Sequence, residues 1–175
     1  CFKGDIRKIY AQGEVFLEVA HDKKHPFIVE SDDFKLQVLG TKFNISNYKG
    51  GATNIVLVEG AVEVTDKNEK KARLNPNDLL NIANGTIAYQ KQVDVAEYIS
   101  WVEGIMLLNG NDLSQIIQRL SIYYGISIQC DPIIGKEKVY GKLDLKDDID
   151  EVIECIQQTL PFTIEKSDTS IYLNK

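Results

Sequence analysis

An internal repeat is the feature of this sequence that most restricts its fold. Residues 112–129 align without gaps on residues 148–165, at a spacing of 36 positions. In both copies the apolar residues step i, i+3, i+4, i+7 and i+11, the spacing of one buried stripe along a helix. The matched positions are Leu113, Ile116, Ile117, Leu120 and Tyr124 in the first copy and Ile149, Val152, Ile153, Ile156 and Leu160 in the second. Each copy therefore predicts one amphipathic helix.

The residues around each stripe predict where the two helices begin and end. Both helices open at an aspartate with a glutamine or glutamate three residues later, a capping-box pattern that satisfies the first N–H groups. These pairs are Asp112 with Gln115 and Asp148 with Glu151. The helices stop at a glycine or a proline, Gly125 and Pro161, both residue types that end helices.

Extended segments lie on both sides of each predicted helix. Ile105–Leu108 and Val139–Leu145 precede the helices, Ile126–Ile128 and Phe162–Ile164 follow them, and Ser170–Leu173 comes last. The carboxyl-terminal part is therefore predicted to be two β-α-β units and a final strand. We expect one small sheet with both helices on one face, an α+β domain over residues 105–175.

The amino-terminal part is predicted to be all-β. Between Lys3 and Gln92, short extended stretches alternate with turn residues, the pattern of a sandwich or barrel. Ile55–Val58 is a continuous apolar run, as in a strand covered on both faces. Asn84-Gly85 is the clearest hairpin signal, because both positions of its turn need positive φ. We expect about nine or ten strands over residues 1–94 and no long helix there.

Residues 95–104 are predicted to link the two parts. Val95–Trp101 has the pattern of a short helix, Gly104 ends it, and Trp101 is interpreted as a hinge or core anchor. The predicted fold class of the whole chain is mainly β plus α+β. An all-β sandwich or barrel-like domain is followed by a duplicated βαβ domain with two helices.

The stretch Gly13–Val38 carries a family-level signal. It is predicted to form three short strands with two turns, and in the first strand Val15, Leu17 and Val19 alternate with Glu14, Phe16 and Glu18. The segments GEVFLEVAHD (13–22), HPFIVES (25–31), VLGTKFNI (38–45), LVEGAVEV (57–64) and LNPND (74–78) occur in this order, followed by Trp101 and Gly104. Together they resemble the extracytoplasmic part of FecR-family anti-sigma factors. The duplicated domain resembles the STN (secretin and TonB, N-terminal) modules of outer-membrane transducers.

The resemblance implies a function in signalling across the bacterial envelope. FecR-type proteins lie in the inner membrane of Gram-negative bacteria, where a cytoplasmic amino-terminal segment holds an extracytoplasmic-function (ECF) sigma factor. The periplasmic part senses the signalling domain of a TonB-dependent outer-membrane transporter. Release or proteolysis of the anti-sigma protein then frees the sigma factor. The sequence matches only the periplasmic part, so we expect the cytoplasmic segment and membrane helix to be missing from it.

Composition and charge argue against other classes. The net charge of −6 disfavours a nucleic-acid partner, because phosphate binding needs clustered Lys and Arg. The basic cluster over residues 67–73 is interrupted by Glu69 and preceded by Asp66, which favours a solvated hairpin tip. No run of about eighteen apolar residues is present, so no segment is predicted to span a membrane.

The three cysteines do not form a disulfide framework. Cys1, Cys130 and Cys155 cannot all pair within one chain. We expect free thiols, and a Cys130–Cys155 bridge is the alternative. The chain begins at Cys1 rather than at methionine, which indicates a fragment; a mature lipoprotein with a lipidated Cys1 is the alternative.

No catalytic, metal or cofactor site is predicted. His21 and His25 lie in a turn next to Pro26, with no cysteine or third histidine nearby to complete a zinc site. Carboxylate pairs such as Glu14/Glu18 and Asp32/Asp33 are expected on solvent faces. No GxSxG, Walker-type, HExxH or CxxC motif is present. The chain is therefore not predicted to be an enzyme.

Partner binding is predicted at the last strand. A small open sheet ends in strands whose unpaired N–H and C=O groups can accept another strand. Ser170, Ile171, Tyr172 and Leu173 form such a docking strand if they lie on an edge; a central or covered position is the alternative.

A second functional class remains open, a carbohydrate- or peptidoglycan-binding sandwich with an appended α+β module. Exposed aromatic residues would favour it, but the tyrosines are scattered along the sequence. They are Tyr10, Tyr48, Tyr89, Tyr98 and Tyr123. A hydrolase is less favoured, because no nucleophile–base or acid–base pair can be named.

Overall fold

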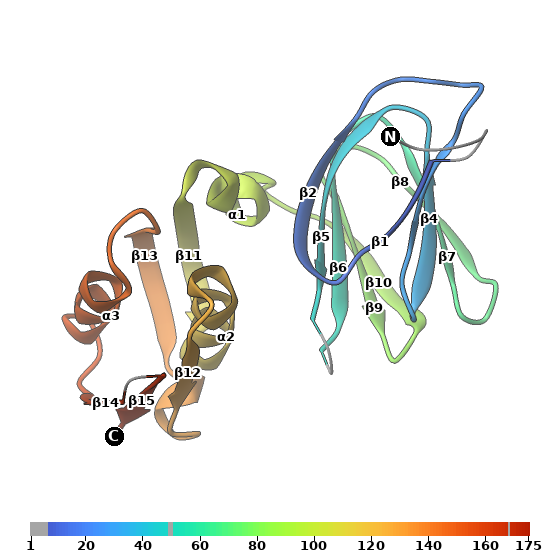
Figure 1. The fold of residues 1–175 in the computed structure, drawn as a ribbon. Helices are drawn as coiled ribbons and strands as arrows, with labels where there is room; N and C mark the ends of the chain where they lie inside the picture. The colour runs from blue at the N-terminus through green and yellow to red at the C-terminus, as the bar shows by residue number, and fades with distance from the viewer. Residues whose placement is uncertain (1–6, 49–50, 168) are drawn as a thin grey trace. The chain divides into compact units, whose positions relative to one another are not determined.

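A computed structural model describes residues 7–48, 51–167 and 169–175 (Figure 1). The chain divides into two compact units, Cys1–Ile99 and Ser100–Lys175, and the division falls within residues 95–104. Each unit has a hydrophobic core of its own. The prediction for Cys1 concerns a residue outside the described ranges.

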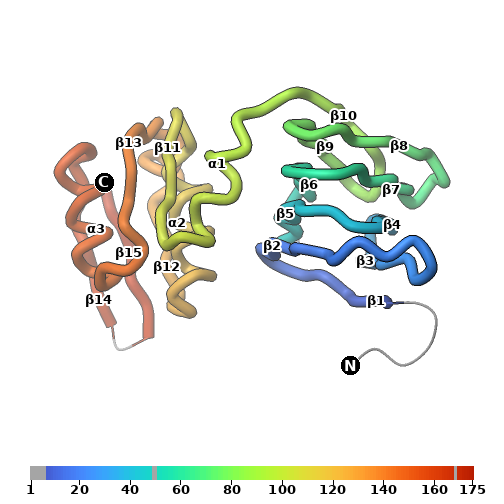
Figure 2. The backbone as a smooth tube through the Cα atoms, turned by 90° about the horizontal axis from the view of Figure 1, so that it is seen from above, coloured from blue at the N-terminus to red at the C-terminus, as the bar shows by residue number. Residues whose placement is uncertain are grey.

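The described residues of the amino-terminal unit form ten strands in two five-stranded sheets. The first sheet has the order β1-β3-β4-β7-β8 and the second the order β10-β9-β6-β5-β2; Figure 2 shows them face to face. The strands are β1 Arg7–Tyr10, β2 Gly13–Val19, β3 Phe27–Glu30, β4 Phe34–Val38, β5 Thr41–Asn47, β6 Thr53–Glu59, β7 Val62–Asp66, β8 Lys71–Leu74, β9 Asp78–Ala83 and β10 Thr86–Gln92. The predicted all-β sandwich is confirmed.

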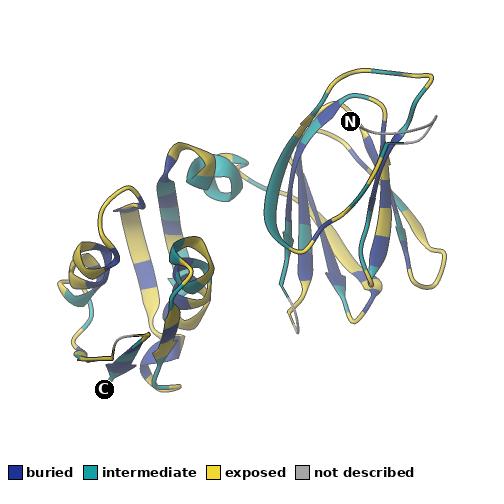
Figure 3. Cartoon of the chain, viewed as in Figure 1, coloured by how far each residue is buried: buried dark blue, intermediate teal, exposed yellow. Residues whose placement is uncertain are grey.

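The sandwich core is built from the inward-facing residues of both sheets. Phe43, Ile45 and Leu80 of the second sheet share one cluster with Leu36 and Val64 of the first. β4 shows the expected alternation, with buried and exposed residues in turn. Residues 55–57 of β6 are all fully buried although they point to opposite faces, which confirms a strand covered on both sides. The buried bands of the strands are visible in Figure 3.

The predicted turns have the backbone that their residues require. Asn84 and Gly85 have φ of 51° and 73°, so the β9–β10 hairpin has two left-handed residues at its tip, as expected. At the turn before β9, the N–H of Asp78 donates to the carbonyl of Asn75 (3.0 Å) and Asn77 has φ of 70°. The residues of each turn therefore determine where the chain reverses its direction.

The structure gives Asp66, at the β7–β8 tip, a different role from the one that the sequence predicted. Asp66 was expected in a solvated tip, yet it is only 4% exposed. Its Oδ1 accepts from the N–H groups of Asn68 and Lys70 (2.9 Å each), and its Oδ2 accepts from the N–H of Ile87 in β10 (3.0 Å). The carboxylate thus ties a hairpin of the first sheet to an edge strand of the second.

A short helical segment follows the sandwich, as predicted. It consists of α1, Ala96–Ile99, and the 3₁₀ helix η1, Ser100–Glu103. Gly104, with φ of 80°, ends it. Trp101 is partly buried against the core of the second unit, in agreement with the interpretation as a core anchor.

The carboxyl-terminal unit contains the duplicated pattern. Its elements are β11 Ile105–Asp112, α2 Leu113–Tyr124, β12 Ser127–Cys130, η2 Ile134–Lys136, β13 Lys138–Asp144, α3 Ile149–Gln157, β14 Thr163–Lys166 and β15 Ser170–Asn174. In both helices the first four stripe residues are buried, and Tyr124 and Leu160 pack at the margin of the core. The two-helix α+β fold is confirmed.

The prediction of one small sheet is wrong. The unit has a two-stranded antiparallel sheet, β11-β13, and a separate three-stranded sheet, β12-β15-β14. Helix α2 contacts both β11 and β12, and all of these elements contribute to one core. Each short sheet buries one face. The core of the unit is therefore enclosed by two small sheets and two helices, where a single sheet with two helices was expected.

The predicted capping boxes are only partly present. The side chain of Asp112 makes no capping bond, because it pairs with Lys138 Nζ (2.9 Å). Asp148 does cap α3, accepting from the N–H of Asp150 (2.9 Å) rather than from that of Glu151. Helix α2 ends at Gly125 with φ of 68°, as expected, whereas α3 already ends at Gln157, before Pro161.

The three N–H donors around Asp66 predict a pH dependence of the first unit. The hydrogen bond from Ile87, followed by those from Lys70 and Asn68, lowers the pKa of Asp66 below its usual value. A group with a lowered folded-state pKa stabilises the fold above its unfolded-state pKa, and this stability is lost as the pH falls through the folded-state pKa. We expect Asp66→Asn to lower the urea midpoint at pH 7 and to flatten its fall under acid.

The matched control is Glu59→Gln, since Glu59 is an exposed carboxylate on β6 that pairs with Lys42 at 3.5 Å. Its urea midpoint should follow that of the wild type at every pH. An unchanged acid profile in Asp66→Asn would show that Asp66 is not the responsible carboxylate.

Candidate protein-binding surface

The predicted docking strand lies inside a sheet. β15 is the central strand of the three-stranded sheet: Ser127–Cys130 pair with Ser170–Leu173 in parallel, and Thr163–Lys166 pair with 171–174 in antiparallel. Ile171 and Leu173 are buried. The premise that Ser170, Ile171, Tyr172 and Leu173 offer a free edge is therefore wrong, because their backbone groups already serve strands on both sides. Any free strand edge of this unit must belong to another strand.

The outer edge of β12 is closed by a helix side chain. Ser121 Oγ donates to the carbonyl of Ile126 (2.5 Å) and accepts from the N–H of Ile128 (3.2 Å). These groups point away from β15, because alternate residues of a strand direct their N–H and C=O to opposite sides. One hydroxyl on α2 thus holds two outward backbone groups at the start of β12, which an added strand would need.

The outer edge of β14 is protected in a related way. The amide of Gln157 donates to the carbonyl of Phe162 (2.6 Å). Gln157 and Phe162 are the positions equivalent to Ser121 and Ile126 in the repeat. β14 also carries the exposed charges Glu165 and Lys166, and Lys166 Nζ pairs with Asp150 (2.5 Å). Charged side chains on an edge strand disfavour strand addition.

The β11–β13 ribbon provides the open edge. Leu145 N donates to Gly104 O (2.7 Å) and Leu113 N to Glu137 O (2.9 Å), so the odd-numbered residues of β13 face β11. The even-numbered residues therefore direct their N–H and C=O outward. These residues are Lys138, Tyr140, Lys142 and Asp144. β13 pairs with no second strand among the described residues, which leaves this edge available for pairing.

The side chains of the same residues form the exposed face of the ribbon. Tyr140 is the most exposed large hydrophobic residue in the described part of the chain, at 67%. Its ring lies over Gly110, where an added Cβ would come within 3.0–3.2 Å of the tyrosine. Gly110 occupies a bulge of β11 with φ of 77°, so the bulge both bends the ribbon and seats the ring. Figure 3 shows β13 as largely exposed with a buried band.

Contacts at both ends fix the ribbon. At one end Lys138 of β13 pairs with Asp112, the last residue of β11, which ties the two strands together where α2 begins. At the other end, Tyr124 Oη donates within 3.0 Å of both Leu145 O and Asp147 O. Burial, more than the neighbouring acidic groups, raises the pKa of Tyr124 to about 12, so its hydroxyl stays protonated and able to donate. These contacts therefore hold the outer edge of β13 in a fixed position.

The histidines and cysteines that the sequence offered as candidates form neither a metal site nor a disulfide in the described part of the chain. His25 Nδ1 lies 2.7 Å from Asp22 Oδ2, a contact that lowers the pKa of Asp22, and no group of three His, Cys, Asp or Glu side chains in the described ranges can hold a metal. Cys130 and Cys155 are not bonded to each other, and burial raises the pKa of the Cys130 thiol. Glu14 was expected on a solvent face, but it accepts from Asn44 Nδ2 (2.6 Å) and Tyr48 Oη (2.7 Å).

None of the helices in the described residues is both long enough and apolar enough to cross a membrane.

Comparison with known proteins shows that both units match models of protein families. Residues 3–63 match the family model described as FecR protein, and residues 105–173 match the model described as FecR, C-terminal. None of the curated proteins compared with the chain matches its sequence.

Solved structures cover nearly the whole chain. Two crystal structures of a protein from Parabacteroides distasonis ATCC 8503, described as an anti-sigma factor, share 30% identity with it and have TM-scores of 0.83 and 0.82. In each comparison the match covers 99% of this chain and 82% of the other. The fold is therefore that of an anti-sigma regulator, a regulatory rather than an enzymatic class. The chain belongs to the FecR family of anti-sigma factors, and this membership implies a sigma factor as partner.

The Ser121 hydroxyl provides a test of edge protection. Ser121→Ala should lower the free energy of unfolding of the second unit by about 1–2 kcal/mol, because Ile126 O and Ile128 N lose their partner. Urea denaturation followed by a reporter in this unit would measure the loss. Ser114→Ala, at an exposed position of the same helix, should change stability by less than about 0.5 kcal/mol. Equal effects of the two substitutions would contradict the role given to Ser121.

Proposed function

We propose that this chain is the periplasmic, signal-receiving part of a single-pass inner-membrane anti-sigma factor of a Gram-negative bacterium. The partner is the signalling domain of a TonB-dependent outer-membrane transporter. Occupancy of the transporter changes this contact, and the change is relayed to an ECF sigma factor held by a cytoplasmic segment. The observation that carries the proposal is the match to FecR family models in both units, residues 3–63 and 105–173.

The contact is proposed at the outer edge of β13. Strand addition draws most of its affinity from backbone hydrogen bonds, and side chains beside the edge give specificity. Of the strand edges in the second unit, that of β13 is seven residues long and carries the exposed Tyr140 and Lys142. On β12 the outward N–H of Ile128 already donates to Ser121, and beside β14 Gln157 holds the carbonyl of Phe162 while the strand itself carries the charges Glu165 and Lys166. These differences favour β13 as the receiving strand.

A pair of proline variants tests the contact. Lys142→Pro removes an outward N–H of β13, and Lys166→Pro is the matched control at the outer edge of β14. The 175-residue chain would be titrated by calorimetry with the signalling domain of the transporter encoded beside it. We expect Lys142→Pro to weaken binding by about tenfold or more, and Lys166→Pro to leave it unchanged.

Two other outcomes would count against the proposal. Equal binding by both variants and the wild type would remove β13 from the interface while leaving the partner in place. Absence of binding by the wild-type chain at tens of micromolar would contradict the transporter signalling domain as partner.

A further inference from the structure

The amino-terminal unit contains a polar hollow that the signalling contact does not use. Its volume is about 410 Å³, and its wall carries two tyrosine rings, Tyr10 and Tyr48, and two amide side chains, Gln12 and Asn47. The β3–β4 turn, with Asp32 and Asp33, and Lys67 from the β7–β8 hairpin form its rim. A second hollow of about 440 Å³ shares this rim and continues over the outer face of the first sheet. The fold thus brings together two tyrosines that lie far apart in the sequence.

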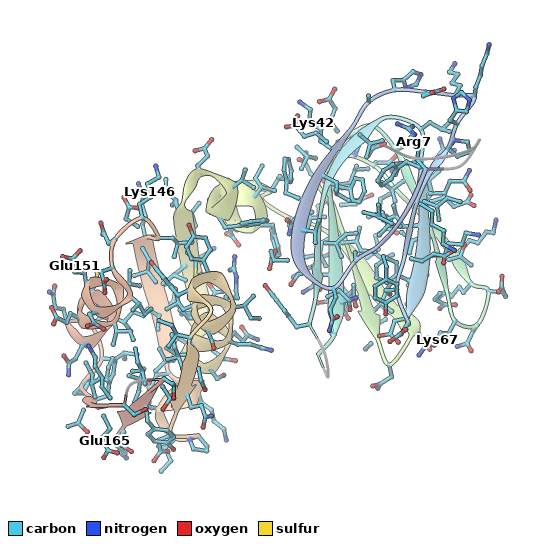
Figure 4. The ribbon with its side chains drawn as sticks, in the orientation of Figure 1. Arg7, Lys42, Lys67, Lys146, Glu151 and Glu165 are labelled. Carbon is cyan, nitrogen blue, oxygen red and sulfur yellow. The ribbon has the colours of Figure 1, made fainter. Side chains whose placement is uncertain are left out.

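The rim is held by contacts from three turns. Ser31 Oγ accepts from the N–H groups of Asp33 (3.1 Å) and Phe34 (3.3 Å), which closes the β3–β4 turn. Lys67 Nζ lies 2.8 Å from Asp33 Oδ1, and its backbone N–H donates to the carbonyl of Gly85 (3.0 Å). Lys67 is labelled at this end of the sandwich in Figure 4. A rim fixed before binding lowers the entropic cost of taking up a ligand.

Hydrogen bonds also fix the groups of the wall. Asn47 donates to Ala11 O (3.0 Å) and accepts from Thr53 Oγ1 (2.8 Å), while Tyr48 Oη donates to Glu14. A hydrogen bond with Asp32 raises the pKa of Tyr10, so that its hydroxyl remains protonated. Tyr10 is nevertheless 59% exposed, which leaves its ring open to a ligand. The hollow therefore presents oriented amides and carboxylates beside an accessible ring.

The chemistry of the lining restricts the ligand class. No aliphatic side chain lines the first hollow, which disfavours an apolar ligand. Its formal charges are two carboxylates and one ammonium, a net −1, which disfavours an anion. A ligand rich in neutral hydroxyl groups suits paired donors and acceptors, and its C–H faces suit the tyrosine rings. Saccharides combine these two properties.

We infer that this hollow binds a neutral oligosaccharide. The site lies entirely within the amino-terminal unit and uses no residue of the β11–β13 ribbon. It is therefore independent of the proposed strand contact, and either can fail without the other.

The test uses chitotetraose and cellotetraose as probes. Two-dimensional NMR of the full chain should show saturable shifts at the amides of Gln12 and Asp32 with at least one of them. Tyr10→Ala should weaken this binding by about tenfold, through loss of the ring surface. The matched control Tyr89→Ala removes a tyrosine of similar exposure (48%) on β10, outside the hollow, and should bind as the wild type does.

A second variant distinguishes a loss of binding from a folding defect. Gln12→Ala truncates an exposed amide in the wall and should also weaken binding while the amide spectrum stays native. Absence of shifts at Gln12 and Asp32 with either probe at about 10 mM would overturn the inference. Wild-type affinity in both Tyr10→Ala and Gln12→Ala would overturn it as well.

Discussion

A buried carboxylate, Asp66, ties the two sheets of the amino-terminal unit to each other. Two sheets that pack face to face are joined by apolar contacts, which are not directional, so their ends need polar contacts to fix a register. Asp66 supplies these contacts, since it closes the β7–β8 tip and accepts from the N–H of Ile87 in the other sheet. The next residue, Lys67, is thereby placed against Gly85 and Asp33. The β7–β8 tip, its link to β10 and the position of Lys67 on the rim of the hollow therefore all depend on Asp66 and the residue beside it.

The second unit shows how a duplicated sequence becomes asymmetric. Ser121 and Gln157 occupy equivalent positions and each donates to the equivalent carbonyl, Ile126 O or Phe162 O. The hydroxyl of Ser121 lies close enough to accept from Ile128 N as well, so it closes more of the edge of β12. On β11, Asn111 Oδ1 accepts from the outward N–H of Asn109 (2.9 Å), whereas in the described part of the chain no such bond is found along β13, which also has the longer exposed face. Both copies of the repeat have the same buried helix stripe. The side chains that follow the stripe differ between the copies and determine which strand edges are free to pair.

Local patterns predicted the elements but not their neighbours. The helix stripes, the Asn84-Gly85 turn and the strands of the sandwich follow from periodicity and turn chemistry, which act over a few residues. The central position of β15 does not, because Ile171 and Leu173 alternate in the same way in an edge strand as in a central one. The role of Asp66 was hidden for a similar reason, since its third donor lies 21 residues further along the chain. Strand order and polar ties between turns are long-range properties, and a single sequence does not display them.

The difference between protected and open edges bears on how specific a contact by strand addition can be. An open edge attracts any extended chain, because backbone groups are the same in every protein. Specificity must then come from the side chains beside the edge, where Tyr140 lies on Gly110 and Lys142 stands on the same face. Ser121 and Gln157 hold backbone groups at the start of β12 and β14, which makes these edges of the same unit poorer competitors. Each additional open edge would offer an extended chain another place to pair, so this arrangement directs strand addition toward β13.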